Sequence, residues 1–210
     1  RLYYLRDARD GARYRWPDEP SLWGLPRDPV SVTGSASFAL GAADREDSAR
    51  RTLAAPWRYV GVDPAFGEFE KPVLVVPSVS VTVAPAGVTW PQGQTQAQSI
   101  SAVVRSEAEG GSQGDVTMSA PVGWTVTPAS QPFELSEAGA ERAMSFDIQP
   151  SLSVAPGSHT FEVAATTGDG RTYDEGYALI DYDHIERTAL FTPAEATVSI
   201  VPVAVREGLR

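Results

Sequence analysis

The sequence predicts an all-β protein built from two consecutive Ig-like antiparallel β-sandwich units, of which the first is incomplete. Apolar and polar residues alternate with a period of two in many short segments, which is typical of strands with one buried face. The 18 glycines and 17 prolines are scattered along the whole chain, so few windows keep a 3.6-residue helical repeat. Short strands separated by turn residues favour antiparallel sandwiches.

The alternating segments define the expected strands and their buried faces. The clearest follows Pro77, where every second residue over 79–83 is valine. The turn Thr167-Gly-Asp-Gly-Arg171 is predicted to close a hairpin, because Asp-Gly readily adopts the positive φ angles of a tight turn. Trp124 follows a turn and begins an alternating segment, so we assign it to the core. Other alternating segments begin at Val30, Ile100, Val116, Met144, Phe161, Tyr177 and Val198.

Two similar segments, each interrupted by a proline, place the domain boundaries. Val75-Val-Pro-Ser-Val-Ser-Val81 resembles Ile200-Val-Pro-Val-Ala-Val205, and a proline suits the point where a chain leaves a sheet because it removes one ladder hydrogen bond. We therefore assign residues 1–77 to a partial β-sandwich unit with long irregular loops, and residues 78–205 to an Ig-like β-sandwich module. Residues 206–210 are assigned to a linker to a following domain. The first unit holds fewer than the roughly seven strands of such a sandwich, so we expect upstream residues or another chain to complete it.

Charge and composition exclude several classes of function. The net charge is −10: residues 1–77 carry eleven basic and eleven acidic side chains, whereas residues 78–210 carry six and sixteen. An acidic module repels phosphate backbones and anionic lipids, so neither nucleic acid nor a membrane is an expected partner. The chain contains no cysteine, which excludes thiol nucleophiles and disulfides. This composition fits a bacterial protein that is secreted or periplasmic.

A candidate metal site lies near residue 180. If this segment is a strand, Asp181 and Asp183 project to one face and could offer oxygen ligands to Ca²⁺. His184 beside them could instead suit Zn²⁺. A solvated strand edge explains the same pattern without a metal. The carboxylates of Asp174 and Glu175 could also suggest glycoside hydrolysis with Asp181, although an acidic chain produces such pairs by chance.

Aromatic side chains crowd the first 70 residues, and four of them are candidate carbohydrate-binding residues: Trp16, Trp23, Trp57 and Tyr59. Flat rings in loops are how sugar-binding modules stack on the apolar faces of pyranoses. The same rings could instead pack within a small, strand-poor unit or against a neighbouring domain. The sequence leaves both interpretations open.

Several short motifs are shared with a known family: Tyr3-Tyr-Leu-Arg6, Trp23-Gly-Leu-Pro26, Tyr59-Val-Gly-Val-Asp-Pro64, Gly67-Glu68 with Lys71-Pro72, Val122-Gly-Trp124, Ala155-Pro-Gly157, Tyr173-Asp-Glu-Gly-Tyr177 and Ile180-Asp-Tyr-Asp-His-Ile185. Together they resemble a region that follows the catalytic domain in large bacterial PIG-L (LmbE-like) deacetylases. Residues 78–205 also resemble the Ig-like module associated with α-galactosidases and other carbohydrate-active enzymes.

The resemblance implies that the chemistry lies outside this chain. In that family a His-Pro-Asp-Asp motif and a later histidine hold zinc, whereas this sequence lacks the motif and has only His159 and His184. The implied function is a non-catalytic accessory region of a secreted, zinc-dependent N-acetyl-sugar deacetylase, with no cofactor in these residues and zinc in the parent's catalytic domain. The expected partners are other domains of the same chain. The alternative is a carbohydrate-binding module that presents loop aromatics to a glycan.

Overall fold

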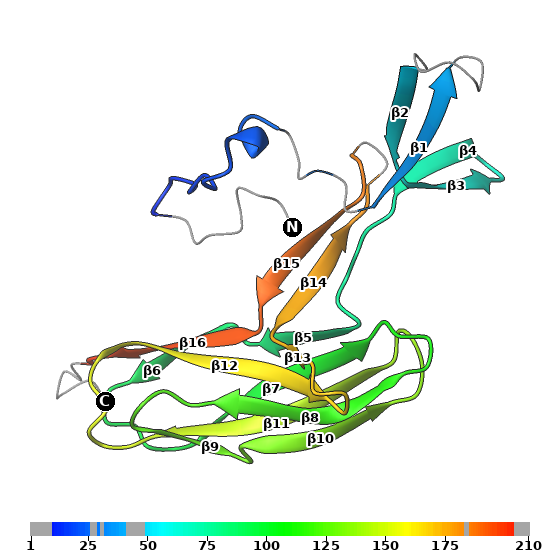
Figure 1. Cartoon of the computed structure of the whole chain (residues 1–210). Helices are drawn as coiled ribbons and strands as arrows, with labels where there is room; N and C mark the ends of the chain where they lie inside the picture. Colours follow the sequence, from blue (N-terminus) through cyan, green and yellow to red (C-terminus); the bar gives the residue numbers. More distant parts are fainter. Residues whose placement is uncertain (1–9, 26–28, 30–31, 41–48, 183–184, 204–210) are drawn as a thin grey trace. The chain divides into compact units, whose positions relative to one another are not determined.

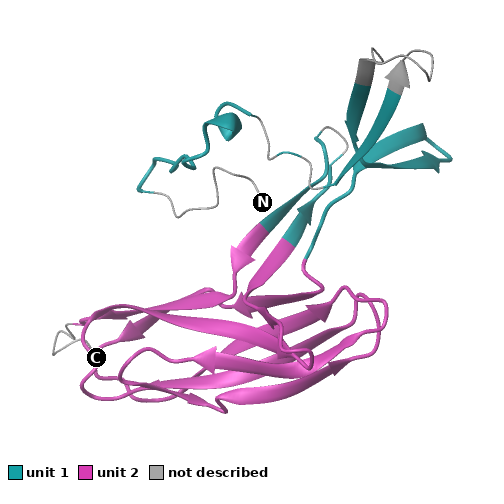
Figure 2. Cartoon of the chain, in the orientation of Figure 1, with its two compact units in different colours: residues 1–76, 178–190 teal, residues 77–177, 191–210 magenta. Residues whose placement is uncertain are grey.

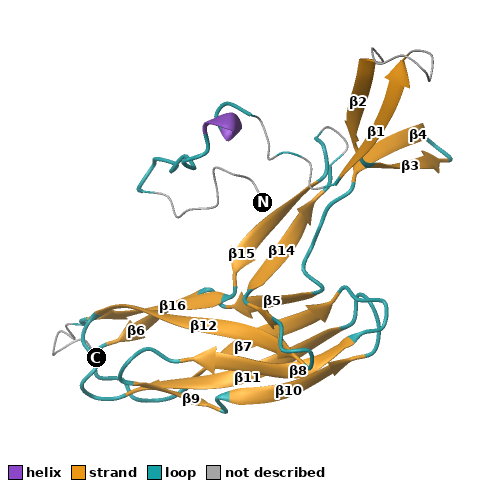
Figure 3. Cartoon of the chain, viewed as in Figure 1, coloured by secondary structure: helices purple, strands orange, loops and turns teal. Residues whose placement is uncertain are grey.

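The computed structural model describes residues 10–25, 29, 32–40, 49–182 and 185–203 (Figure 1). Their regular structure is almost entirely strand, and the single turn of 3-10 helix η2 (Pro20–Leu22) is the only helical element among them (Figure 3). The all-β class predicted from the alternating segments is therefore confirmed. Within the described residues, no helix is long and apolar enough to cross a membrane.

The chain divides into two compact units (Figure 2). Unit 1 consists of residues 1–76 and 178–190, and unit 2 consists of residues 77–177 and 191–210. The chain first passes from unit 1 to unit 2 after residue 76, next to the boundary that was assigned from the sequence after residue 77. The sequence predicted a continuous second unit, however, whereas the structure assigns residues 178–190 to unit 1. The linker assigned to residues 206–210 lies outside the described residues.

Unit 2 is an Ig-like sandwich of two sheets, and its strands are paired with their neighbours in a fixed order. One sheet has the order β10-β8-β12-β16-β6, with β13 paired to β12; the other has the order β5-β7-β11-β9. All pairs are antiparallel except β16–β6, which is parallel. The strand bounds of the first sheet are Ser130–Leu135 (β10), Ser112–Ser119 (β8), Gly157–Thr167 (β12), Glu195–Val201 (β16), Gly87–Pro91 (β6) and Thr172–Tyr173 (β13). Those of the second are Val79–Ala84 (β5), Gln98–Ser106 (β7), Glu141–Pro150 (β11) and Trp124–Thr127 (β9).

The core of unit 2 lies between these two sheets and uses the faces that the alternation predicted. On β7, Ile100 and Val104 have no exposed surface, and the same holds for Phe161 and Val163 on β12. Trp124 is 7% exposed, as expected for a core residue. Its ring lies edge-on to those of Trp90 and Phe161, with centroid distances of 5.2 and 5.1 Å. Edge-to-face pairs of this kind add to the free energy of burial.

One glycine of this sandwich is required by the close approach of two strands. A Cβ at Gly114 on β8 would overlap the backbone carbonyl of Thr166 on the neighbouring β12. We expect Gly114→Ala to force the strands apart and to lower the free energy of unfolding of unit 2 by about 1–3 kcal/mol, measured by urea denaturation. Gly168→Ala is the matched control, because nothing lies within 4 Å of a Cβ at that position. Equal losses of stability in the two variants would contradict this account.

Unit 1 contains two hairpins, each an antiparallel sheet of two strands. β1 (Thr33–Leu40) pairs with β2 (Ala49–Pro56), and β3 (Arg58–Asp63) pairs with β4 (Gly67–Pro72). Among the described residues of this unit, the buried apolar side chains are Leu22 and Ala189. The described residues of these hairpins form two separate two-stranded sheets. That further residues complete the first unit stays a prediction.

A two-stranded ribbon carries the chain from unit 2 into unit 1 and back. It is formed by β14 (Glu175–Ile180) and β15 (Thr188–Pro193), which pair with each other. The alternating residues that begin at Tyr177 therefore belong to this ribbon and not to a sandwich sheet. Period-two alternation marks a strand but does not identify the strand beside it, which explains the difference from the predicted domain.

Candidate functional site

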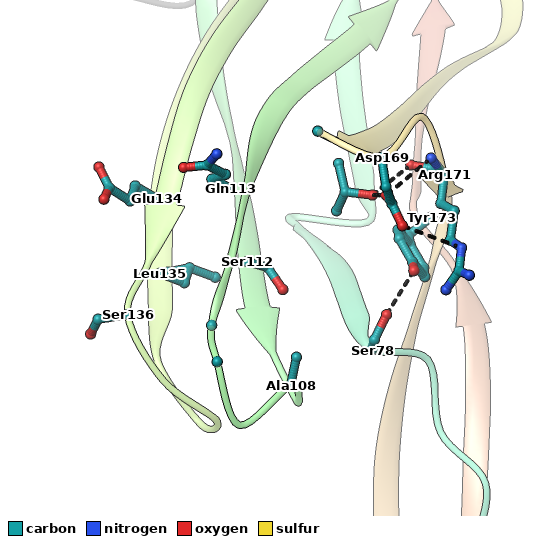
Figure 4. A pocket seen from close by; sticks show the side chains of 14 residues that line it. Ser78, Ala108, Ser112, Gln113, Glu134, Leu135, Ser136, Asp169, Arg171 and Tyr173 are labelled. Atoms are coloured by element: carbon teal, nitrogen blue, oxygen red, sulfur yellow. Dashed lines mark hydrogen bonds and ion pairs between the residues drawn. The ribbon is translucent and has the colours of Figure 1, made fainter.

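Unit 2 has a pocket at one end of its sandwich, which we call the loop-end pocket (Figure 4). It is a cavity of about 710 Å³ formed where the β7–β8, β10–β11 and β12–β13 connections meet. Its lining is rich in small and polar residues, among them Ser78, Gly110, Ser112, Gln113, Glu134, Ser136, Asp169, Arg171 and Tyr173. Loops at the end of a sandwich are common positions for binding sites because the sheets hold them in place.

The β12–β13 connection supplies two of the charged side chains of this pocket, Asp169 and Arg171, and β10 supplies Glu134. The hydroxyl of Thr167 donates to Asp169 Oδ1 at 2.5 Å, and the backbone N–H of Arg171 donates to the same oxygen at 3.4 Å. Arg171 Nε lies 3.3 Å from Asp169 Oδ2. The hydrogen bond from Thr167 lowers the pKa of the Asp169 carboxyl below its ordinary value of 3.8. A turn is thus present at the Asp-Gly sequence, but of its two residues only Gly170 has a positive φ, 82°. The prediction of a tight turn with positive φ angles at both Asp169 and Gly170 is therefore wrong, and four residues join β12 to β13.

Other hydroxyls at this end of the sandwich are bonded to one another. Ser78 Oγ and Tyr173 Oη lie 2.6 Å apart. Ser106 has no exposed surface, and its Oγ lies 2.9 Å from that of Ser112 and accepts from the backbone N–H of Ala108 at 3.3 Å. These bonds join the start of β5 to β13 and hold the β7–β8 loop. The polar groups therefore stabilise the loops that form the pocket.

The pKa of Asp169 gives a direct test of this geometry. We expect Thr167→Val to raise that pKa toward 3.8, because the variant lacks the donating hydroxyl. Since folding depresses the pKa, the stabilising contribution is present above the unfolded value and is lost as the pH falls through the folded one. Carboxyl chemical shifts followed by NMR between pH 2 and 6 measure it. Thr166→Val is the control, because the Thr166 hydroxyl pairs with Thr172 instead; an unchanged Asp169 pKa in Thr167→Val would show that the hydroxyl is not the cause.

Unit 1 has a second cavity, of about 500 Å³, which we call the hairpin pocket. It lies between the β3–β4 hairpin and residues 181–182 and 185–187, all of which belong to unit 1. Its lining combines three aromatic rings with charged side chains: Asp63, Phe66, Phe69, Glu70, Lys71, Pro72, Asp181, Tyr182, Ile185, Glu186 and Arg187. Lys71 Nζ donates to Asp181 at 3.0 Å, and Arg58 donates to Glu186 at 3.2 Å.

The four candidate carbohydrate-binding residues all lie in unit 1, and each exposes more than half of its surface. The exposed fractions are 54% for Trp16, 55% for Trp23, and 60% for both Trp57 and Tyr59. Trp23 Nε1 donates to the carbonyl of Pro17 at 2.7 Å, which fixes that ring locally. Trp57 immediately precedes β3 and Tyr59 lies within it, so the chain brings these two together by sequence.

The candidate metal residues are placed only in part by the structure. β14 ends at Ile180, so Asp181 follows the strand instead of lying on it as the sequence suggested. The Asp181 carboxylate is bound by Lys71, with Arg187 Nε 3.6 Å away. Asp183 and His184 lie outside the described residues. Within the part of the chain that the structure describes, no three His, Asp or Glu side chains are grouped as metal ligands.

Sequence reasoning did not identify Lys71 or Arg187 as site residues. Lys71 contacts a carboxylate 110 positions away in the chain, and no local pattern indicates such a pairing. The aromatic content of residues 57–69 was visible in the sequence, but the position of this segment beside residues 181–182 and 185–187 was not. Only the ribbon of β14 and β15 makes these segments neighbours.

No family model and no curated protein matches this sequence. Solved structures with a similar arrangement include WR4, a member of the C. elegans MSP family, with 8% identity and a TM-score of 0.33, covering 58% of this chain and 97% of that one. AggA, the major subunit of an E. coli aggregative adherence fimbria, has 14% identity and a TM-score of 0.33, covering 59% and 94%. A family 123 glycoside hydrolase from Clostridium perfringens has 7% identity and a TM-score of 0.36, and this chain covers only 28% of it. Such values assign neither a family nor an activity to this chain.

Proposed function

We propose that this chain is a non-catalytic accessory region of a larger secreted or periplasmic carbohydrate-active enzyme. We further propose that the enzyme is a zinc-dependent N-acetyl-sugar deacetylase of the PIG-L type. Support for the parent family comes from the motifs between Tyr3 and Ile185. In this proposal the zinc belongs to the parent's catalytic domain, and the partners of these residues are other domains of the same chain.

The state of the loop-end pocket is the observation that carries the non-catalytic role. Asp169 accepts a hydrogen bond from the hydroxyl of Thr167 at 2.5 Å and lies 3.3 Å from Arg171 Nε. The neighbouring hydroxyls of Ser78 and Tyr173 bond to each other at 2.6 Å. These groups are used to hold loops together, which is the role expected of a scaffold.

An activity assay tests this role directly. We expect purified 1–210, with or without added Zn²⁺, to release no acetate from N,N′-diacetylchitobiose. A catalytic zinc needs three protein ligands and an open position, whereas this sequence has only two histidines and lacks the His-Pro-Asp-Asp motif. Enzyme-coupled detection of acetate measures the reaction. The control is the same protein with His184 replaced by alanine. Zinc-dependent release of acetate by both proteins would contradict the proposal and would place the chemistry in this chain.

The parent family is tested by the gene. If the proposal is correct, the reading frame that encodes these residues also encodes a His-Pro-Asp-Asp motif before Arg1. A reading frame without that motif would contradict the deacetylase assignment, and the accessory role would then need another enzyme.

A second candidate function is supported by the exposed rings of unit 1. Trp57 and Tyr59 are both 60% exposed and lie two residues apart on one segment. Aromatic faces that remain accessible can stack on pyranose rings. A carbohydrate-binding module is therefore the alternative to a purely structural role.

A further inference from the structure

We propose that the hairpin pocket of unit 1 binds an uncharged pyranose unit of a glycan. This inference rests on the second candidate function and specifies its site and its ligand. The pocket differs from the loop-end pocket in composition, since Phe66, Phe69 and Tyr182 line it together with charged groups. Sugar sites combine these two elements, because a pyranose has an apolar face and a rim of hydroxyls.

The aromatic surface of the pocket is built by the β3–β4 hairpin. Phe69 pairs with Gly61 across the hairpin, and a Cβ at Gly61 would lie only 2.5 Å from Phe69 Cζ. The ring therefore covers the glycine, and it is also 6.0 Å from the ring of Tyr59. Phe66 lies in the turn between the strands and is 88% exposed. Phe66 and Phe69 both line the cavity, so their rings offer apolar surface for stacking.

The polar side of the pocket is a cluster of two cations around the carboxylate of Asp181. Lys71 Nζ donates to both oxygens of this carboxylate, at 3.0 and 3.1 Å, and Arg187 Nε lies 3.6 Å from Oδ2. The three side chains are between 36% and 39% exposed, so parts of them remain accessible from the pocket. A sugar hydroxyl can accept from one of the cations and donate to the carboxylate of Asp181.

The charges of the lining indicate which glycans fit. Four carboxylates and two cations line the pocket: Asp63, Glu70, Asp181 and Glu186 against Lys71 and Arg187. Arg58 pairs with Glu186 at 3.2 Å, so the lining with this partner has a formal charge of −1. Both cations are within 4 Å of Asp181. A uronic or sialic acid would bring a carboxylate into a negatively charged site, which is unfavourable. Uncharged sugars are therefore expected to bind better than acidic ones.

The test uses the full chain 1–210 and three hexasaccharides: chitohexaose, cellohexaose and the anionic hexagalacturonate. Isothermal titration calorimetry is expected to show binding of at least one uncharged sugar and weaker or no binding of hexagalacturonate. NMR of the unsubstituted protein is expected to place the ligand-induced shifts at residues 63–72 and 181–187. Arg187→Met keeps the length of the side chain but removes the donor, and we expect about tenfold weaker binding. Arg171→Met in the loop-end pocket is the matched control and should bind normally.

The outcomes separate the site from the function. One outcome would overturn the hairpin pocket but retain carbohydrate binding. In that outcome the NMR shifts are confined to Trp16, Trp23 and Trp57, Arg187→Met binds the sugar with normal affinity, and Trp57→Ala does not bind it. Binding of none of the three sugars would overturn both. Tighter binding of hexagalacturonate than of either uncharged sugar would overturn the assignment of the ligand class. Because the NMR map uses the unsubstituted protein, it decides the site even if Arg187→Met fails to fold.

Discussion

Replacing Phe161 with alanine is expected to lower the free energy of unfolding of unit 2 by about 3–5 kcal/mol. The ring has no exposed surface and lies on β12, which is paired with β8 on one side and β16 on the other. Its removal would leave a cavity between the two sheets and would take away the edge contact with Trp124. Two paired neighbours hold β12 in place, so the structure cannot readily collapse into the space. Urea denaturation followed by near-ultraviolet circular dichroism measures the loss.

Phe66→Ala is the matched control for this variant. It removes the same atoms from a ring that is 88% exposed and belongs to unit 1. We expect its effect on the transition of unit 2 to be within about 0.5 kcal/mol, as is usual for surface substitutions. If the two alanine variants lost similar amounts of stability, burial between the sheets would not be the cause.

Cutting the chain after residue 77 is expected to have the largest effect of all. Residues 78–210 alone, which include residues 178–190 of unit 1, should unfold in one cooperative transition, because unit 2 has a continuous core of 21 buried residues. Residues 1–77 alone should be unfolded or aggregated. Their described part contributes Leu22 as its buried apolar residue, and each hairpin has only two strands. A two-stranded hairpin is marginally stable in water, and its open edges pair with other chains.

The ribbon strengthens this expectation for unit 1. The fragment 1–77 lacks residues 178–190, so it loses the Lys71–Asp181 and Arg58–Glu186 contacts as well as buried Ala189. Thermal unfolding followed by circular dichroism, with size-exclusion chromatography, measures both fragments. A soluble, monomeric 1–77 with a sharp thermal transition would contradict the incompleteness of the first unit.

Local patterns in the sequence determined much of unit 2. Alternation at Ile100, Val104 and Phe161 identified the faces that are buried, because successive side chains of a strand point to opposite sides. The place of the turn at 167–171 followed from the Asp-Gly sequence, although only Gly170 has the positive φ expected there. The burial of Trp124 followed from its place at the start of an alternating segment. Each of these features depends on residues that are close together in the chain.

Strand partners could not be predicted in the same way. β9 and β10 are separated by only two residues, yet they lie in different sheets. β6 pairs with β16 in parallel across more than 100 positions of the chain. Alternation fixes which face of a strand is buried but carries no information about the strand that lies beside it.

The sequence by itself therefore determined the all-β class, the buried faces of the sandwich and the position where the chain first leaves unit 1. The tertiary structure alone decided that residues 178–190 join unit 1 and that Lys71 and Arg187 meet around Asp181. The physical reason is the range of the interactions. Side-chain alternation and turn preferences act over a few residues, whereas strand pairing and ion pairs join residues whose separation only the folded chain removes.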